Sequence, residues 1–189
     1  TQSRSSAASD VYKRQGKMAK SKKTNAMRML DRAKIKYGMN TYEVTDKHQH
    51  GEQIAKLVGA NVEEVYKTLV LENANHDHFF FVIPVNASLD MKEAAHVVNE
   101  KKLQLMPLDQ LKQVTGYVRG GCSPIGMKHL FQTTIDASAK NLDKVYVSGG
   151  QRGMQIIIQV DDLVEMTQAQ LAHICLLYTS DAADDLLCV

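Results

Sequence analysis

Two glycine-rich segments carry the residue types and spacing in this chain that could do chemistry. Residues 115–127 read TGYVRGGCSPIGM, and residues 148–153 read SGGQRG. Adjacent glycines let backbone N–H groups turn toward one point and let a ligand approach the main chain. A plain surface loop is the alternative for one such segment, and the recurrence of the pattern weighs against it. The candidate substrate-binding residues here are Gly120, Gly121, Ser123, Ser148, Gly149 and Arg152.

A lysine in an apolar strand is the second chemical signal. Residues 65–71 (VYKTLVL) alternate as a strand with two apolar faces, and Lys67 shares one face with Val65 and Leu69. A buried ammonium group is costly unless a carbonyl or an anion receives it, so Lys67 either binds a ligand or extends to solvent. With Asp136 at the end of a later strand, these groups can bind a carbonyl and a small amino-acid-like moiety.

The sequence does not favour a nucleophile supplied by the protein. Cys122 has no histidine partner in a known flanking pattern, because His129 alone does not make a dyad, so an inert thiol is favoured. Ser123 and Ser148 lack the strand–turn–helix context of a nucleophile elbow. No GK[ST] follows either glycine segment, which argues against a phosphate-binding loop. His48 and His50 are interpreted as loop residues rather than metal ligands, and we expect no metal and no cofactor.

The elements that must position these groups can be predicted from periodicity and capping residues. An α+β fold is expected, with a mixed, mostly antiparallel, barrel-like sheet and surrounding helices. The predicted helices cover residues 25–34, 51–58, 90–98, 107–115 and 161–172. The predicted strands cover residues 39–44, 65–71, 77–85, 102–106, 131–136, 144–148 and 154–160.

The two ends of the chain are expected to be non-native. Residues 5–15 and 175–184 can be encoded by opposite strands of one DNA cassette, which resembles a sequencing-library transposon adapter. We therefore predict an adapter-like leader at 1–17, one domain at 18–174 and an adapter-like tail at 175–189. The net charge of +2 is too small to indicate a nucleic-acid partner by itself. The longest apolar run, residues 79–85, is far short of a membrane span. A cytoplasmic protein is expected.

Five motifs in order resemble the YbaK/EbsC family of Cys-tRNA(Pro) deacylases, which are related to the editing domain of prolyl-tRNA synthetase. They are VYKTLV, PVNASLDMKEAA, TGYVRGGCSPIGM, TTIDASA and YVSGGQRGMQI. The resemblance implies the YbaK-like fold and hydrolysis of the ester in Cys-tRNA(Pro), with the substrate's own thiol attacking the carbonyl. It implies a catalytic role for Lys67 and substrate-binding roles for Gly120, Gly121, Ser148 and Asp136. Tyr42 matches a tyrosine that lines the family's pocket.

The implied partners are tRNA(Pro) charged with Cys and, transiently, prolyl-tRNA synthetase, with no membrane contact and a monomeric state. Two alternatives stay open. One is a related deacylase for another small aminoacyl-tRNA such as Ala-tRNA(Pro). The other is a non-catalytic module that binds tRNA or synthetase, which would protect the ester stoichiometrically instead of clearing it in multiple turnover.

Overall fold

The computed structural model describes residues 23–176. The predicted leader at 1–17 lies outside the described residues, as does the predicted tail apart from Cys175 and Leu176. The helices that cover the strands are α2 (Asn25–Arg32), α3 (Gly51–Val58), α4 (Met91–Val97), α5 (Leu111–Thr115) and α6 (Val160–Thr167), with 3₁₀ turns at Val62–Glu64, Leu108–Gln110 and Ala137–Asn141.

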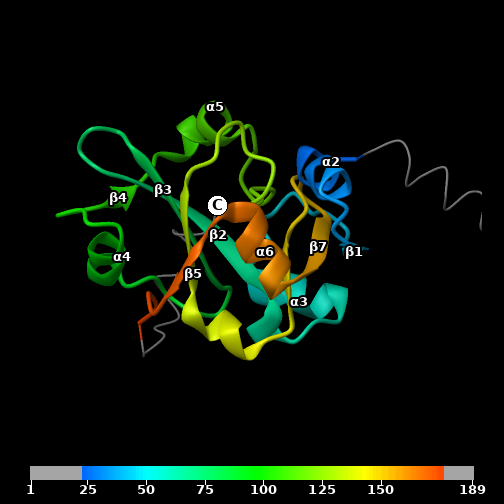
Figure 1. Cartoon of the computed structure of the whole chain (residues 1–189). Coiled ribbons are helices and arrows are strands. Elements are labelled where there is room, and N and C mark those ends of the chain that lie inside the picture. The colour runs from blue at the N-terminus through cyan, green and yellow to red at the C-terminus, as the bar shows by residue number, and fades with distance from the viewer. Residues whose placement is uncertain (1–22, 177–189) are drawn as a thin grey trace, which may run out of the picture.

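The strands form two sheets (Figure 1). A three-stranded antiparallel sheet has the order β1 (Gly38–Thr41), β7 (Met154–Gln159) and β6 (Lys144–Ser148). A five-stranded sheet has the order β4 (Gln104–Leu105), β2 (Tyr66–Glu72), β3 (His78–Pro84), β5 (Gln132–Asp136) and β8 (Gln170–Ala172). β5 runs parallel to β3 and β8, and β2 runs antiparallel to its neighbours. A parallel bridge between Val65 and Tyr146 joins the two sheets.

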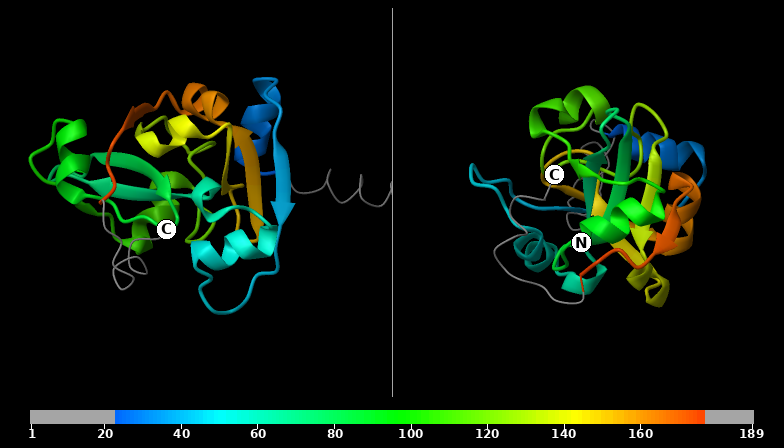
Figure 2. Two further views of the ribbon diagram at one scale, coloured as in Figure 1. Left: turned by 90° about the horizontal axis from the view of Figure 1, so that it is seen from below. Right: turned by 90° about the vertical axis from the view of Figure 1, so that its left-hand side faces the viewer.

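The helix ends follow the capping signals in the sequence. The Thr24 hydroxyl accepts a hydrogen bond from the Met27 N–H at the start of α2, and the Asp90 carboxylate accepts from Lys92 and Glu93 N–H at the start of α4. Gly59 ends α3 in the left-handed conformation at φ 69°, which glycine adopts without strain. α4 and the β1–β7 pair lie at opposite ends of the molecule in Figure 1 and in the left-hand view of Figure 2.

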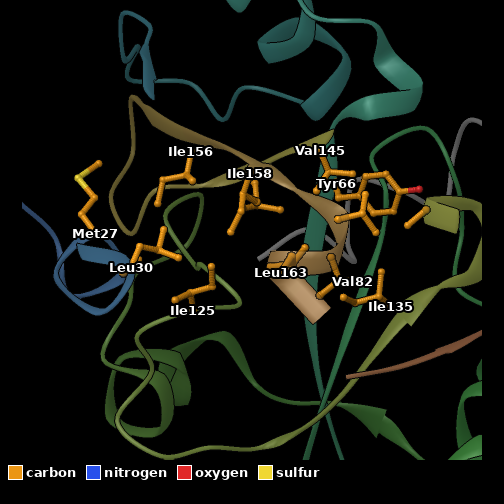
Figure 3. Close-up of a cluster of buried hydrophobic side chains, with 14 of the residues drawn as sticks. Met27, Leu30, Tyr66, Val82, Ile125, Ile135, Val145, Ile156, Ile158 and Leu163 are labelled. Carbon is orange, nitrogen blue, oxygen red and sulfur yellow. The ribbon is translucent and has the colours of Figure 1, made fainter. Parts of the chain in front are cut away.

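The main core cluster lies between the two sheets (Figure 3). Tyr66, Val82 and Ile135 contribute from the five-stranded sheet, and Ile156 and Ile158 from the three-stranded sheet. Leu30 of α2 and Leu163 of α6 close the cluster. On the opposite face of β2 and β3, a second cluster packs against α4. β2 is therefore buried along its whole length, as its two apolar faces predicted.

The predicted α+β class and the mixed, mostly antiparallel pairing are confirmed, and three details differ. The last helix ends at Thr167, because Gln168 turns left-handed at φ 51°, and Gln170–Ala172 forms β8 instead of continuing the helix. Only Gln104–Leu105 of the predicted strand at 102–106 pairs with β2. The strands also divide between two bridged sheets.

Candidate active site

A small cavity of about 60 Å³ lies where the two sheets meet, near the start of β2. β2 contributes Lys67 and Thr68, and β6 and β7 contribute Ser148 and Gln155. Four residues predicted from the sequence line it together: Tyr42, Lys67, Gly120 and Ser148. The structure thus brings the strand lysine and both glycine segments to one cavity.

Lys67 is held inside the protein. Lys67 is only 8% exposed, and its ammonium group donates a hydrogen bond to the Val85 carbonyl oxygen at 3.5 Å. Val65 and Val85 form an apolar wall beside it. An ammonium group in such surroundings interacts strongly with any negative charge that develops within reach, because little water screens it.

Lys67 and Thr68 are consecutive in β2, so their side chains point in opposite directions, yet both line the same cavity. They can do so because the main chain of β2 is open along one edge. On that edge β4 pairs only with Leu71 and Glu72, and the bridge to β6 is made at Val65. Within the described residues, no other strand pairs with the stretch between these contacts. A strand edge presents backbone N–H and C=O groups. The Val70 carbonyl oxygen already accepts from the Met106 N–H at 3.1 Å, so the part of this stretch nearer Val65 can offer main-chain groups to a ligand.

The two glycine segments pack directly on one another. A Cβ added to Gly121 would lie 2.9 Å from the Cα of Gln151, so this backbone contact excludes any side chain. Gly120, at φ 79°, lies against the side chain of Arg152. Gly149 is buried, and a Cβ there would meet Met154 Cγ at 2.9 Å. These contacts hold the two segments against each other beside the cavity.

The N-terminal helix anchors both segments. The Thr24 hydroxyl donates to the Gly149 carbonyl oxygen at 2.5 Å, and the Tyr117 hydroxyl donates to the Ile125 carbonyl oxygen at 2.6 Å. Gly126, at φ 80°, leaves room for the backbone of Ala26, which a Cβ there would approach to 2.5 Å. The position of α2 therefore fixes the glycine backbone of the site.

Cys122 lines the cavity, but its thiol is not activated. The residue is 2% exposed, and burial raises the pKa of its thiol to about 12, despite the opposing effect of a hydrogen bond with Thr115. Burial also raises the pKa of Tyr66, which lines the cavity too, to about 12. Both groups are neutral at pH 7, in line with the expectation of an inert thiol.

Gln155 is a cavity residue that sequence reasoning missed. It is 6% exposed, and its Oε1 atom is buried with no hydrogen-bond partner among the described residues. A buried acceptor without a partner costs free energy and is uncommon in proteins. Its place in β7, opposite Ser148, was part of a predicted strand, but no sequence pattern marked it as functional.

Four predicted site residues do not line the cavity directly. Gly121, Ser123 and Gly149 are buried next to lining residues, and the Ser123 hydroxyl accepts from the Ile125 N–H at 3.3 Å. Arg152 is exposed and donates to the Thr45 carbonyl oxygen at 3.1 Å. All four shape or support the walls of the cavity.

Asp136 also lies outside the lining, and its contacts are structural. Its carboxylate accepts from the Ser138 N–H and the Ile174 N–H, each at 3.1 Å, which ties the end of β5 to the chain after β8. Burial works to raise the pKa of this carboxyl, but hydrogen bonds from Ser138 and Ile174, and one from Cys175, lower the pKa below its usual value. Its predicted substrate contact finds no support in this geometry.

His48 and Gln49 line the cavity as well, although the sequence suggested only a loop there. Within residues 23–176, no cluster of three or more histidine, cysteine or acidic side chains could hold a metal ion. None of the helices described is long and apolar enough to cross a membrane.

Solved structures share this fold. A structure described as a proposed trans-editing enzyme for prolyl-tRNA synthetase matches with a TM-score of 0.68 and 21% identity, covering 80% of this chain and 92% of that one. The hypothetical protein APE2540 matches with a TM-score of 0.72 and 20% identity, covering 81% of this chain and all of that one (100%). The chain thus has the two-sheet α+β fold of these structures.

The sequence comparisons identify the family. The profile of the aminoacyl-tRNA editing domain matches residues 47–166, and the chain belongs to this family. EbsC of Enterococcus faecalis, a proposed Cys-tRNA(Pro)/Cys-tRNA(Cys) deacylase, is 38% identical over 160 residues, which cover 83% of this chain and 98% of EbsC. The uncharacterized protein YwhH of Bacillus subtilis is 27% identical over 116 residues, covering 61% of this chain and 73% of YwhH. The resemblance to the YbaK/EbsC family is confirmed.

Proposed function

We propose that the protein removes cysteine from mischarged Cys-tRNA(Pro), with the substrate's own thiol as the nucleophile. The observation that carries this proposal is a small, buried cavity that pairs a lysine ammonium with a glycine backbone, while the thiol in its wall has a pKa raised to about 12. A site of this kind can orient an ester and stabilise negative charge, but it leaves the attack to the substrate.

In the proposed reaction the substrate sulfur forms a bond to the ester carbonyl carbon, and the bond from that carbon to the ribose oxygen breaks. The thiol proton ends on the departing ribose hydroxyl, and water then hydrolyses the cyclic thioester to cysteine. Lys67 and main-chain groups of Gly120 and the β2 edge stabilise the negative oxygen of the intermediate. Holding thiol and carbonyl together replaces a bimolecular encounter by an intramolecular one.

Gln155 has a role in this proposal. The α-amino group of the substrate needs an acceptor, and Gln155 Oε1 is an acceptor without a partner among the described residues. The pairing satisfies both groups once the aminoacyl moiety is bound. The volume of about 60 Å³ suits a small side chain such as that of cysteine.

The test is deacylation of Cys-tRNA(Pro) by catalytic amounts of protein, with Ala-tRNA(Pro) and Ser-tRNA(Pro) beside it, each with and without prolyl-tRNA synthetase. We expect multiple turnover on the cysteinyl ester and little on the other two, because alanine has no thiol and serine has a weaker nucleophile. Equal rates on Ala-tRNA(Pro) would exclude the thiol mechanism. Stoichiometric protection of the ester would instead identify a binding module.

We further propose that the protein acts as a monomer that meets the synthetase transiently. The residues that line the cavity all belong to one chain, which supports this proposal. A stable complex on size exclusion, or activity seen only in a dimer fraction, would contradict it.

A further inference from the structure

A single peptide unit connects the N-terminal helix to a residue of the cavity. The peptide between Gly149 and Gly150 has a carbonyl oxygen that accepts a hydrogen bond from the Thr24 hydroxyl at 2.5 Å. The N–H of the same peptide donates to the Ser148 Oγ atom at 3.3 Å. Ser148 is the last residue of β6 and lines the cavity. Thr24, which does not line the cavity, is thus linked to it through one peptide and one side chain.

The orientation of this peptide is not fixed by its own residues. A peptide plane rotates through ψ of the residue before it and φ of the residue after it, and here both residues are glycines. Gly150 has φ 103°, which residues with a side chain rarely adopt. A Cβ on Gly150 would also lie 3.1 Å from the Thr24 Cβ and 3.0 Å from the Tyr117 Cε1. The two glycines allow this close packing, but the direction of the carbonyl depends on its hydrogen-bond partners.

The Thr24 hydroxyl is held in a way that commits its proton to Gly149. Thr24 is buried, and its Oγ1 atom accepts from the Met27 N–H at 3.3 Å as the N-cap of α2. A hydroxyl has one proton to donate, and the Gly149 carbonyl oxygen receives it. The Gly149 N–H donates to the Met154 carbonyl oxygen at 2.9 Å, which fixes the other side of this residue. One hydroxyl therefore caps the helix and orients the turn.

The same hydrogen bonds decide what Ser148 can offer to a ligand. Its Oγ atom accepts from the Gly150 N–H through a lone pair, so its own proton remains available to an acceptor in the cavity. Hydrogen bonds in a chain polarise one another. Donation by Thr24 to the peptide carbonyl strengthens the peptide N–H as a donor, and this in turn strengthens the Ser148 hydroxyl as a donor.

We propose that Thr24 is a positioning residue, which holds the peptide between Gly149 and Gly150 so that the Ser148 hydroxyl donates a hydrogen bond to the carbonyl oxygen of the bound ester. This inference rests on the proposed function, because it assumes that an aminoacyl ester occupies the cavity. The hydrogen bond from Ser148 strengthens as negative charge develops on the ester oxygen. Its alignment therefore affects the chemical step more than binding.

The kinetic test compares Thr24→Val with Thr24→Ser in deacylation of Cys-tRNA(Pro). Valine keeps the branched shape and removes the hydroxyl, so kcat should fall about tenfold while KM stays within about twofold. Serine keeps the hydroxyl and should restore most of kcat. In the double variant Thr24→Val/Ser148→Ala, kcat should equal that of Ser148→Ala alone, because both changes remove the same hydrogen bond. Losses that multiply in the double variant would overturn the proposal.

Asp90→Ala is the matched control for the loss of a helix cap. It removes the N-cap of α4, where the carboxylate accepts from the Lys92 and Glu93 N–H groups. Like Thr24→Val, it should lower the midpoint of urea unfolding, but kcat should not change at a temperature where both variants are folded. An equal fall of kcat in the two variants would show that lost stability, not peptide orientation, slows the reaction, and would overturn the proposal.

Amide NMR tests the peptide itself, so its outcome does not depend on deacylation. The Gly150 N–H resonance should move upfield in Thr24→Val and in Ser148→Ala, and its hydrogen exchange should become about tenfold faster. In Thr24→Ser and Asp90→Ala the resonance should stay in place. An unchanged Gly150 resonance in Thr24→Val would overturn the proposal. If the resonance moves as expected but the original protein does not deacylate Cys-tRNA(Pro), the role of Thr24 in orienting the peptide stands and the proposed reaction fails.

Discussion

Gly121 and Gln151 meet backbone to backbone, so a Cβ on the glycine would lie 2.9 Å from the Gln151 Cα. This contact joins two segments about thirty residues apart in the chain and sets the wall from which Gly120 and Ser148 reach the cavity. The spacing of the glycines is therefore a packing requirement as well as a chemical one.

Gly121→Ala should push the two segments apart. We expect a loss of about 1–3 kcal/mol in the free energy of unfolding and a large loss of deacylation activity, because overpacking shifts the backbone. Urea unfolding and single-turnover deacylation measure the two effects. Gly59→Ala is the control, since its Cβ meets nothing within 4 Å and only the left-handed φ of 69° is strained. Full activity in Gly121→Ala would show that the contact between Gly121 and Gln151 does not shape the active cavity.

Lys67→Met should abolish activity and preserve the fold. The methionine keeps most of the buried volume and removes the charge, so the rate should fall about 100-fold or more, as when a group that stabilises an oxyanion is lost. The midpoint of urea unfolding should stay close to that of the unchanged protein. A rate within threefold of the original would remove Lys67 from the mechanism.

Gln155→Met should change stability and activity in opposite directions. Removing an acceptor that has no partner among the described residues should leave the free energy of unfolding equal or raise it by about 1 kcal/mol. Deacylation should still fall about tenfold or more, because the substrate amine loses its acceptor. Parallel losses of both would indicate a purely structural role.

Cys122→Ser should be nearly silent in deacylation. Burial raises the pKa of the thiol to about 12, so no ionisation of Cys122 shapes the activity between pH 6 and 9 in the original protein. The pH–rate profiles of the two proteins should superimpose. Loss of activity in a folded Cys122→Ser variant would indicate that the protein itself supplies the nucleophile.

Asp136→Ala should destabilise the fold by about 2 kcal/mol at pH 7, since the buried N–H of Ile174 and the half-buried N–H of Ser138 lose a charged acceptor. The pKa of Asp136 is lower in the folded state than its usual 3.8, so the unfolded chain binds the proton more readily. The stabilisation by ionised Asp136 is therefore fully present above pH 3.8 and is lost as the pH falls through the lower pKa of the folded state. The difference in unfolding free energy between the two proteins should therefore shrink from pH 6 to pH 3. If the difference in unfolding free energy did not change with pH, the charge of Asp136 would not be what stabilises the fold.

The sequence predicted most elements because local signals and tertiary packing agree. The N-cap at Thr24, the left-handed Gly59 and the two apolar faces of β2 are each compatible with only one local structure. The helix expected at 161–172 was wrong beyond Thr167, since the strand Gln170–Ala172 depends on parallel pairing with β5, a long-range contact that periodicity does not report.

The same limit applies to the site. Lys67 stood out because a charge in an apolar strand is locally anomalous, whereas Gln155 is an ordinary strand residue whose significance comes from its missing partner. Asp136 has the chemistry of a ligand-binding group, and its neighbours in space, Ser138 and Ile174, each donate a hydrogen bond to one of its oxygens. Only coordinates distinguish these cases.

The bridge between Val65 and Tyr146 closes the two sheets beside Lys67. Half-assembled chains, in which either sheet has formed without the other, contain no walls for the ester. We therefore expect the onset of the proposed deacylation during refolding to coincide with the docking of the two sheets.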